Sequence, residues 1–160
     1  MTHSGTFLTA CSQEQVFELL ATPGRFAPLL PGYEGVVIHD ESHFTLRTAI
    51  ALAKIQGHVN LRMELQDLER PTRATYRGEG TVADSQLRLG LQFGIAPVEG
   101  MTEVSWRGEF TIDGMLASMV AGLIEPMGRE HFERMVERLQ EGLRATDAPV
   151  ELQRRTETEV

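Results

Sequence analysis

The chain has 160 residues, of which 41% are hydrophobic and 24% are charged, as expected for one soluble globular domain with a buried core. Its formal net charge of -8 disfavours binding to nucleic acid and adsorption to anionic lipid, since both need a basic surface. A single cysteine, Cys11, excludes an internal disulfide and a metal site built from several thiolates.

The N-terminal residues 1–10 lack the basic start and the apolar run of a signal peptide. No stretch of the sequence approaches the roughly 20 apolar residues of a membrane span. We therefore expect a cytoplasmic protein without an integral membrane segment.

Residues 5–30 predict one short strand followed by two short helices. The strand covers residues 5–10, and the first helix begins at Ser12 and ends near residue 21. Ser12 is a favourable N-cap, and Gln15 three residues later completes a capping-box pattern. The second helix ends before Pro31, because proline disfavours helix in the residue that precedes it.

Six strands are predicted next, at residues 35–39, 44–52, 55–68, 74–81, 86–95 and 102–112. Along four strand-like stretches, apolar and polar residues alternate with a period of two, which places them on opposite faces of a sheet. The clearest apolar row consists of Ile55, Gly57, Val59, Leu61, Met63 and Leu65. Short turn-rich connections, including one at residues 96–100, predict an antiparallel meander. The apolar face carries no acid, base or nucleophile, which suits the binding of an apolar molecule.

After Gly114 the apolar residues recur every three to four positions, which predicts one long amphipathic helix to about Ala145. Pro126 would bend this helix because it removes a backbone donor. Residues 146–160 are polar and are predicted to form a disordered tail. Residues 1–145 then form one ligand-binding domain.

This order of elements resembles the START-like, helix-grip (SRPBCC) superfamily of α+β proteins. In that fold a curved antiparallel sheet of six to seven strands wraps around a long C-terminal helix, two short helices follow the first strand, and a cavity lies between sheet and helix. Within the superfamily, the sequence resembles the family of the carbon monoxide dehydrogenase G subunit (CoxG). The resemblance is carried by Leu30-Pro31-Gly32, by Leu-Gln-Asp-Leu-Glu-Arg-Pro at 65–71 and by Tyr-Arg-Gly-Glu-Gly at 76–80.

The resemblance implies an accessory protein of a molybdenum-containing, carbon-monoxide-dehydrogenase-type hydroxylase. Members of the family are associated with enzyme maturation or membrane recruitment, and with binding a hydrophobic partner such as a quinone. We therefore expect this chain to have a hydrophobic small molecule and a molybdenum hydroxylase complex as partners, and no nucleic acid.

Three clusters of reactive side chains have a structural interpretation. His39-Asp40-Glu41-Ser42-His43 is interpreted as a solvated hairpin turn rather than a metal site. Glu130-His131, with Glu133 and Glu137, is interpreted as the charged outer face of the last helix. Cys11 is interpreted as a small, partly buried residue. We expect no catalytic residue, no metal site and no resident cofactor.

The predicted walls of the cavity come from the last helix and from the strands that face it. Helix methionines are either ordinary core residues or a flexible wall for an apolar guest. The residues expected to line the cavity are Met119, Gly122 and Leu123, opposite Tyr76, Phe93 and Trp106. Tyr76 would offer its hydroxyl to a carbonyl of a quinone-like guest.

The expected function is the binding, without transformation, of a hydrophobic or amphipathic molecule that is quinone-like or lipid-like. Two alternatives stay open. One is a cyclase or dehydratase of the same fold, for which Tyr76, Thr48 and Glu125 are the available acids or bases. The other is a protein-interaction module with a filled core, which pocket volume would distinguish from a binder.

Overall fold

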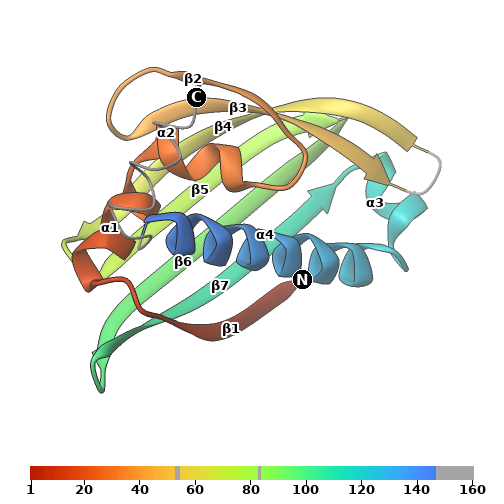
Figure 1. The fold of residues 1–160 in the computed structure, drawn as a ribbon. Coiled ribbons are helices and arrows are strands. Elements are labelled where there is room, and N and C mark those ends of the chain that lie inside the picture. The colour runs from red at the N-terminus through yellow and green to blue at the C-terminus, as the bar shows by residue number, and fades with distance from the viewer. Residues whose placement is uncertain (53–54, 83, 147–160) are drawn as a thin grey trace, which may run out of the picture.

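The computed structural model describes residues 1–52, 55–82 and 84–146, and the tail predicted to be disordered lies outside them from residue 147 onward. Its main element is one antiparallel sheet of seven strands, in the order β1-β7-β6-β5-β4-β3-β2. The strands are β1 (Thr2–Thr9), β2 (Tyr33–Ile38), β3 (His43–Leu52), β4 (Ile55–Glu69), β5 (Arg73–Val82), β6 (Ser85–Val98) and β7 (Met101–Asp113). The sheet curves around a long C-terminal helix, α4 (Ile124–Thr146), so the predicted fold class is confirmed (Figure 1).

The short helices after β1 are α1 (Gln13–Ala21), α2 (Pro23–Phe26) and the 3-10 turn η1 (Ala27–Leu29). The predicted capping box is present: the Gln15 backbone N–H donates to Ser12 Oγ at 3.1 Å, and the Ser12 N–H donates to Gln15 Oε1 at 2.8 Å. The predicted second helix is divided between α2 and η1. Pro28 explains the division, because it has no N–H to continue the α-helical pattern.

The predicted loop at residues 96–100 is wrong, since only Glu99 and Gly100 connect β6 to β7. Both have positive φ, +46° and +82°, as in the two-residue turns that match the twist of a hairpin. Pro97 is tolerated in β6 because its backbone nitrogen faces a side where no neighbouring strand needs an N–H donor. The Ile95 N–H donates to Thr72 O beside β5, so Pro97, two residues later, points to the same side but past the end of β5.

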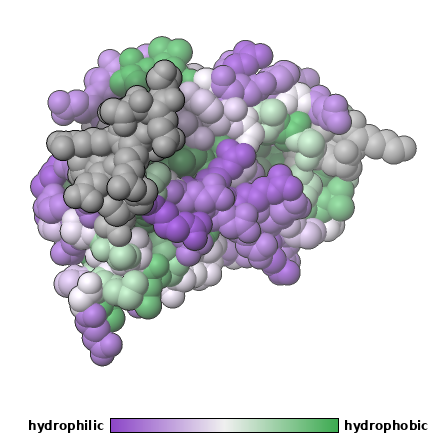
Figure 2. Space-filling model, viewed as in Figure 1, coloured by the Kyte–Doolittle hydropathy of each residue, from purple (hydrophilic) through white to green (hydrophobic). Residues whose placement is uncertain are grey.

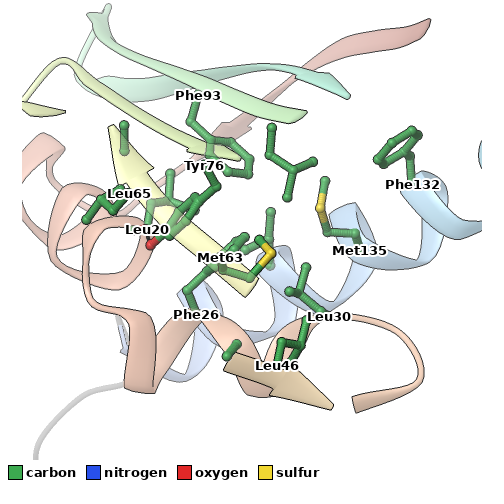
Figure 3. Close-up of a cluster of buried hydrophobic side chains, with 14 of the residues drawn as sticks. Leu20, Phe26, Leu30, Leu46, Met63, Leu65, Tyr76, Phe93, Phe132 and Met135 are labelled. Atoms are coloured by element: carbon green, nitrogen blue, oxygen red, sulfur yellow. Dashed lines mark hydrogen bonds between the residues drawn. The ribbon is translucent and has the colours of Figure 1, made fainter. Parts of the chain in front are cut away.

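The concave face of the sheet carries the core. Along β4, Val59, Leu61, Met63 and Leu65 are buried, whereas the alternate residues Gln56, His58, Asn60, Arg62 and Glu64 are exposed, as the alternation predicts. An aromatic cluster of Phe26, Phe44, Tyr76 and Phe93 fills one end of this face (Figure 3). Phe26 stacks on Tyr76 with ring centroids 4.5 Å apart, and the Phe93 ring meets Phe26 edge-on at 5.6 Å.

The C-terminal region forms two helices rather than the one predicted. A short helix, α3 (Met115–Val120), ends in a turn, and α4 starts at Ile124. Pro126 accounts for the interruption. In a continuous helix its ring would clash with the carbonyl of Gly122, whereas in the first turn of a new helix no N–H is required.

Candidate ligand-binding cavity

An apolar cavity of about 130 Å³ lies between the first half of α4 and the concave face of the sheet. The sheet lines it with Thr48, Ile50, Val59, Leu61, Leu87, Leu89 and Phe110. The helix lines it with Ile124, Met127, Gly128, His131 and Phe132. Figure 2 shows hydrophobic surface in the hollow between the hydrophilic outer side of α4 and the strands beyond it.

The cavity exists because α4 packs toward one side of the sheet. The helix contacts β1 and, near its end, α1 and η1, and its first half lies apart from β3 and β4 (Figure 1). Ile50, Leu89 and Phe110 are only half-buried there. Gly57 pairs with Ile50 and therefore faces the same side of the sheet, and a Cβ at this position would meet no atom within 4 Å. The space beside the cavity is thus open at Gly57.

Two side chains give the lining its polar groups. The Thr48 hydroxyl is buried and donates to the carbonyl of Pro31 at 3.2 Å, so its hydrogen is already used within the fold. His131 lies at the rim and is exposed, although protein atoms surround its imidazole closely enough to desolvate it. Burial lowers the pKa of His131, and the positive charges of Arg134 and Arg138 lower this pKa further. At neutral pH the imidazole is therefore uncharged, with one N–H donor and one acceptor nitrogen.

The position of His131 corrects the sequence-based interpretation of its cluster. Glu130, Glu133 and Glu137 are exposed on the outer face of α4 as predicted, but His131 borders the cavity. The sequence feature that could have placed His131 correctly is its spacing, because His131 follows Met127 by four residues and Gly128 by three. That spacing puts it at the edge of the apolar stripe rather than on the opposite face.

Three of the six predicted wall residues lie elsewhere in the core. Tyr76 and Phe93 belong to the aromatic cluster, where both are fully buried, and the Tyr76 hydroxyl donates to the carbonyl of Leu20. Burial raises the pKa of this hydroxyl. Trp106 is half-buried and lies against Gly5, with its ring centroid 5.9 Å from that of Phe132.

The other three lie on α3 and the turn after it, and they face outward. Met119 is 68% exposed, Leu123 is 40% exposed and Gly122 is also exposed, while Leu116 and Val120 form the buried side of α3. The break before Pro126 turns this segment relative to α4, so the helical stripe does not continue across it. None of the six residues is among those that line the cavity.

The remaining candidate clusters have structural roles. The Asp40 carboxylate accepts hydrogen bonds from the backbone N–H groups of Ser42 and His43 at 2.8 Å and lies 2.9 Å from His43 Nδ1, which closes the predicted hairpin turn. These contacts lower the pKa of Asp40. Cys11 is buried, and its Sγ donates to Leu143 O at 3.0 Å. Within residues 1–52, 55–82 and 84–146, no three histidine, cysteine or acidic side chains form a metal site.

A larger hollow of about 500 Å³ lies on the outer face of the sheet, between long charged side chains such as Arg62, Arg77, Glu79 and Arg88. These side chains are exposed, and Arg62 pairs with Glu79 at 3.4 Å. The lining of this hollow is more polar than apolar, whereas the lining of the cavity under α4 is mostly apolar and offers a hydrophobic guest more. The apolar cavity is therefore the better candidate site.

Residues 5–144 match the family model of the carbon monoxide dehydrogenase G subunit (CoxG). The chain belongs to the CoxG family. No curated protein matches the chain in sequence.

Solved structures place this CoxG chain among START-like folds. A conserved protein from Geobacillus kaustophilus is 13% identical, with a TM-score of 0.79 over 91% of this chain and 97% of that one. A protein from Thermus thermophilus is 16% identical, with a TM-score of 0.68 over 92% and 100% of the two chains. A START superfamily protein from Mycobacterium smegmatis is 14% identical, with a TM-score of 0.61 over 91% and 98%. Among the described residues of the CoxG chain, no helix is long and apolar enough to cross a membrane.

Proposed function

We propose that this CoxG-family protein binds a hydrophobic or amphipathic small molecule, quinone-like or lipid-like, without transforming it. In this role it serves as an accessory to a molybdenum-containing, carbon-monoxide-dehydrogenase-type hydroxylase. The apolar cavity under α4 carries the proposal of ligand binding. Membership of the CoxG family supports the link to the hydroxylase.

The size of the cavity limits how much of a guest can be enclosed. An apolar protein cavity of about 150 Å³ accommodates benzene, so about 130 Å³ fits roughly one ring or a short alkyl segment. Burying on the order of 150 Å² of apolar surface at about 25 cal/mol per Å² supplies about 4 kcal/mol, before the cost of ordering the guest is subtracted. The rest of a larger molecule would extend out of the cavity past His131, which lies at the rim.

An enzyme of the cyclase or dehydratase class is the second candidate, and His131 is the observation that favours it. An uncharged imidazole beside a cavity is suited to accept a proton. The enzyme candidate is weaker than the binding candidate because the described cavity wall offers no second acid or base. The Thr48 hydroxyl donates to a carbonyl, and Glu125 is exposed and pairs with Arg129 at 3.3 Å. Binding without chemistry therefore ranks first.

Trp106 allows a direct test, because it is the only tryptophan and adjoins Phe132 on the cavity wall. Titration with a short-chain 1,4-benzoquinone is expected to quench its fluorescence in a saturable manner. Gly57→Leu, which fills the open space beside the cavity, is expected to weaken binding about tenfold or more. Gly35→Leu is the matched control, since a Cβ there also meets no atom within 4 Å but Gly35 pairs with the exposed Arg47.

Equal quenching in the wild type and both variants would contradict binding in this cavity. Turnover of the quinone, detected by product analysis and lost in His131→Gln, would favour the enzyme instead.

A further inference from the structure

We infer that the rim of the cavity selects amphipathic guests with a carboxylate head group, held by Arg138 with His131 beside it. This inference rests on the proposed function, because it assumes that the cavity takes an apolar segment. It narrows the guest to the class of alkyl or aryl carboxylic acids in their ionised form.

One hydrogen bond of Arg138 places it close to the edge of the cavity. Its Nη1 donates to the carbonyl of Leu30 at 3.3 Å. The next carbonyl along the chain, that of Pro31, accepts the hydrogen of the Thr48 hydroxyl, and Thr48 lines the cavity. Arg138 and the Thr48 wall are thus attached to two consecutive peptide units between η1 and β2. The guanidinium group therefore joins α4 to the segment before β2, next to the Thr48 wall of the cavity.

Unlike Arg129 and Arg134 on the same helix, Arg138 has no ion pair with a glutamate four residues before it. On the same helix, Arg129 pairs with Glu125 at 3.3 Å and Arg134 pairs with Glu130 at 2.7 Å, both at a spacing of four residues. Position 134, four residues before Arg138, is itself an arginine, so this pattern cannot repeat. No carboxylate in the described part of the chain forms an ion pair with Arg138. Its guanidinium uses a neutral carbonyl and has further N–H groups to donate.

His131 lies seven residues before Arg138 on the same side of α4. Side chains on a helix lean toward its N-terminus, so Arg138 extends back toward His131. The two groups are close enough for the charge of Arg138 to lower the pKa of the imidazole. A carboxylate at the rim would accept two parallel N–H bonds from the guanidinium and one from the imidazole.

This arrangement separates the two halves of an amphipathic acid. The apolar segment contacts Ile50, Leu89 and Phe132 inside the cavity, and the charged end stays at the partly exposed rim. Such a position avoids the cost of burying a carboxylate while it adds charge-assisted hydrogen bonds. A guest with the same chain but no charge would have only the apolar contacts.

Calorimetric titration at pH 7.5 with decanoate and with 1-decanol tests this inference, since the two share a chain length and differ in head group. The wild type is expected to bind decanoate about tenfold more tightly. Arg138→Gln is expected to remove this preference and to leave 1-decanol binding unchanged. Arg129→Gln is the matched control on the same helix and is expected to keep the preference.

Equal affinity of the wild type for both molecules, or a preference that survives in Arg138→Gln, would overturn the inference and leave apolar binding intact. If neither molecule nor the benzoquinone binds the wild type, the proposed function itself fails, and the inference fails with it.

Discussion

The two ends of the concave sheet face are closed in different ways. At one end, α1 and α2 bring Phe17 and Phe26 onto the sheet, and the rings of the aromatic cluster around Tyr76 are fully buried against one another. At the other end, the first half of α4 is the main cover, and the opposing strands present Thr48, Ile50 and Gly57. Figure 3 shows Phe132 on α4 standing apart from the cluster around Tyr76. The filled end stabilises the fold, whereas the open end has room for a guest.

The largest expected difference between the two ends is in the cost of losing a side chain. Phe26→Ala removes a fully buried ring that stacks on Tyr76, so we expect the free energy of unfolding to fall by about 3–5 kcal/mol. Urea denaturation measures this loss. The control is Val37→Ala, since Val37 is 60% exposed and its loss should change stability by less than about 0.5 kcal/mol. A similar small loss for Phe26→Ala would mean that the aromatic end is not tightly packed.

A smaller effect is expected at the open end. Ile50→Ala shortens a half-buried side chain that already borders empty space, so the free energy of unfolding should fall by less than about 2 kcal/mol. The same change enlarges the cavity and should strengthen binding of a bulkier quinone. Denaturation and Trp106 fluorescence measure the two effects. If Ile50→Ala costs as much as Phe26→Ala, the two ends are equally well packed and the comparison fails.

The smallest expected effect concerns pH. The pKa of His131 is lowered in the folded chain relative to its ordinary value of 6.5, so the unfolded chain takes up this proton more readily. The stability that comes from the neutral imidazole is therefore present above about pH 6.5 and is lost as the pH falls toward the lower folded value. His131→Gln should lose less stability than the wild type between pH 7.5 and 5.

Thermal denaturation across this range checks the prediction. The pKa of His43 is raised by Asp40 and acts in the opposite direction, but it is the same in both proteins and cancels in their difference. Parallel stability curves for the wild type and His131→Gln would show that the imidazole is not desolvated at the rim.

Most of the fold could be predicted from the sequence because its signals are local. Alternation along β4 and the Ser12–Gln15 capping box depend on neighbouring residues, and both are present as predicted. The prediction of a single C-terminal helix is wrong because periodicity continues across residues 121–123, although Pro126 restarts the helix. A proline in a helical pattern indicates a bend or a break, and the choice between them depends on tertiary packing.

The cavity was harder to predict, because its walls depend on where elements lie relative to one another. Tyr76 and Phe93 face the predicted side of the sheet, yet α1 and α2 cover them. Met119 and Leu123 carry the apolar character expected of a wall, but α3 turns them outward. The charged neighbours of His131 in the sequence indicate the outer face of α4. Its spacing of four residues from Met127 instead indicates the cavity rim. In each case the missing information is how the helices pack against the sheet.

Gly108 determines the shape of the cavity without being part of its wall. A Cβ at this position would lie 2.4 Å from the ring of Phe132, which does line the cavity. Any larger residue on β7 at this point would push that ring away from the sheet. One substitution at Gly108 would therefore reshape the cavity from a position outside its lining.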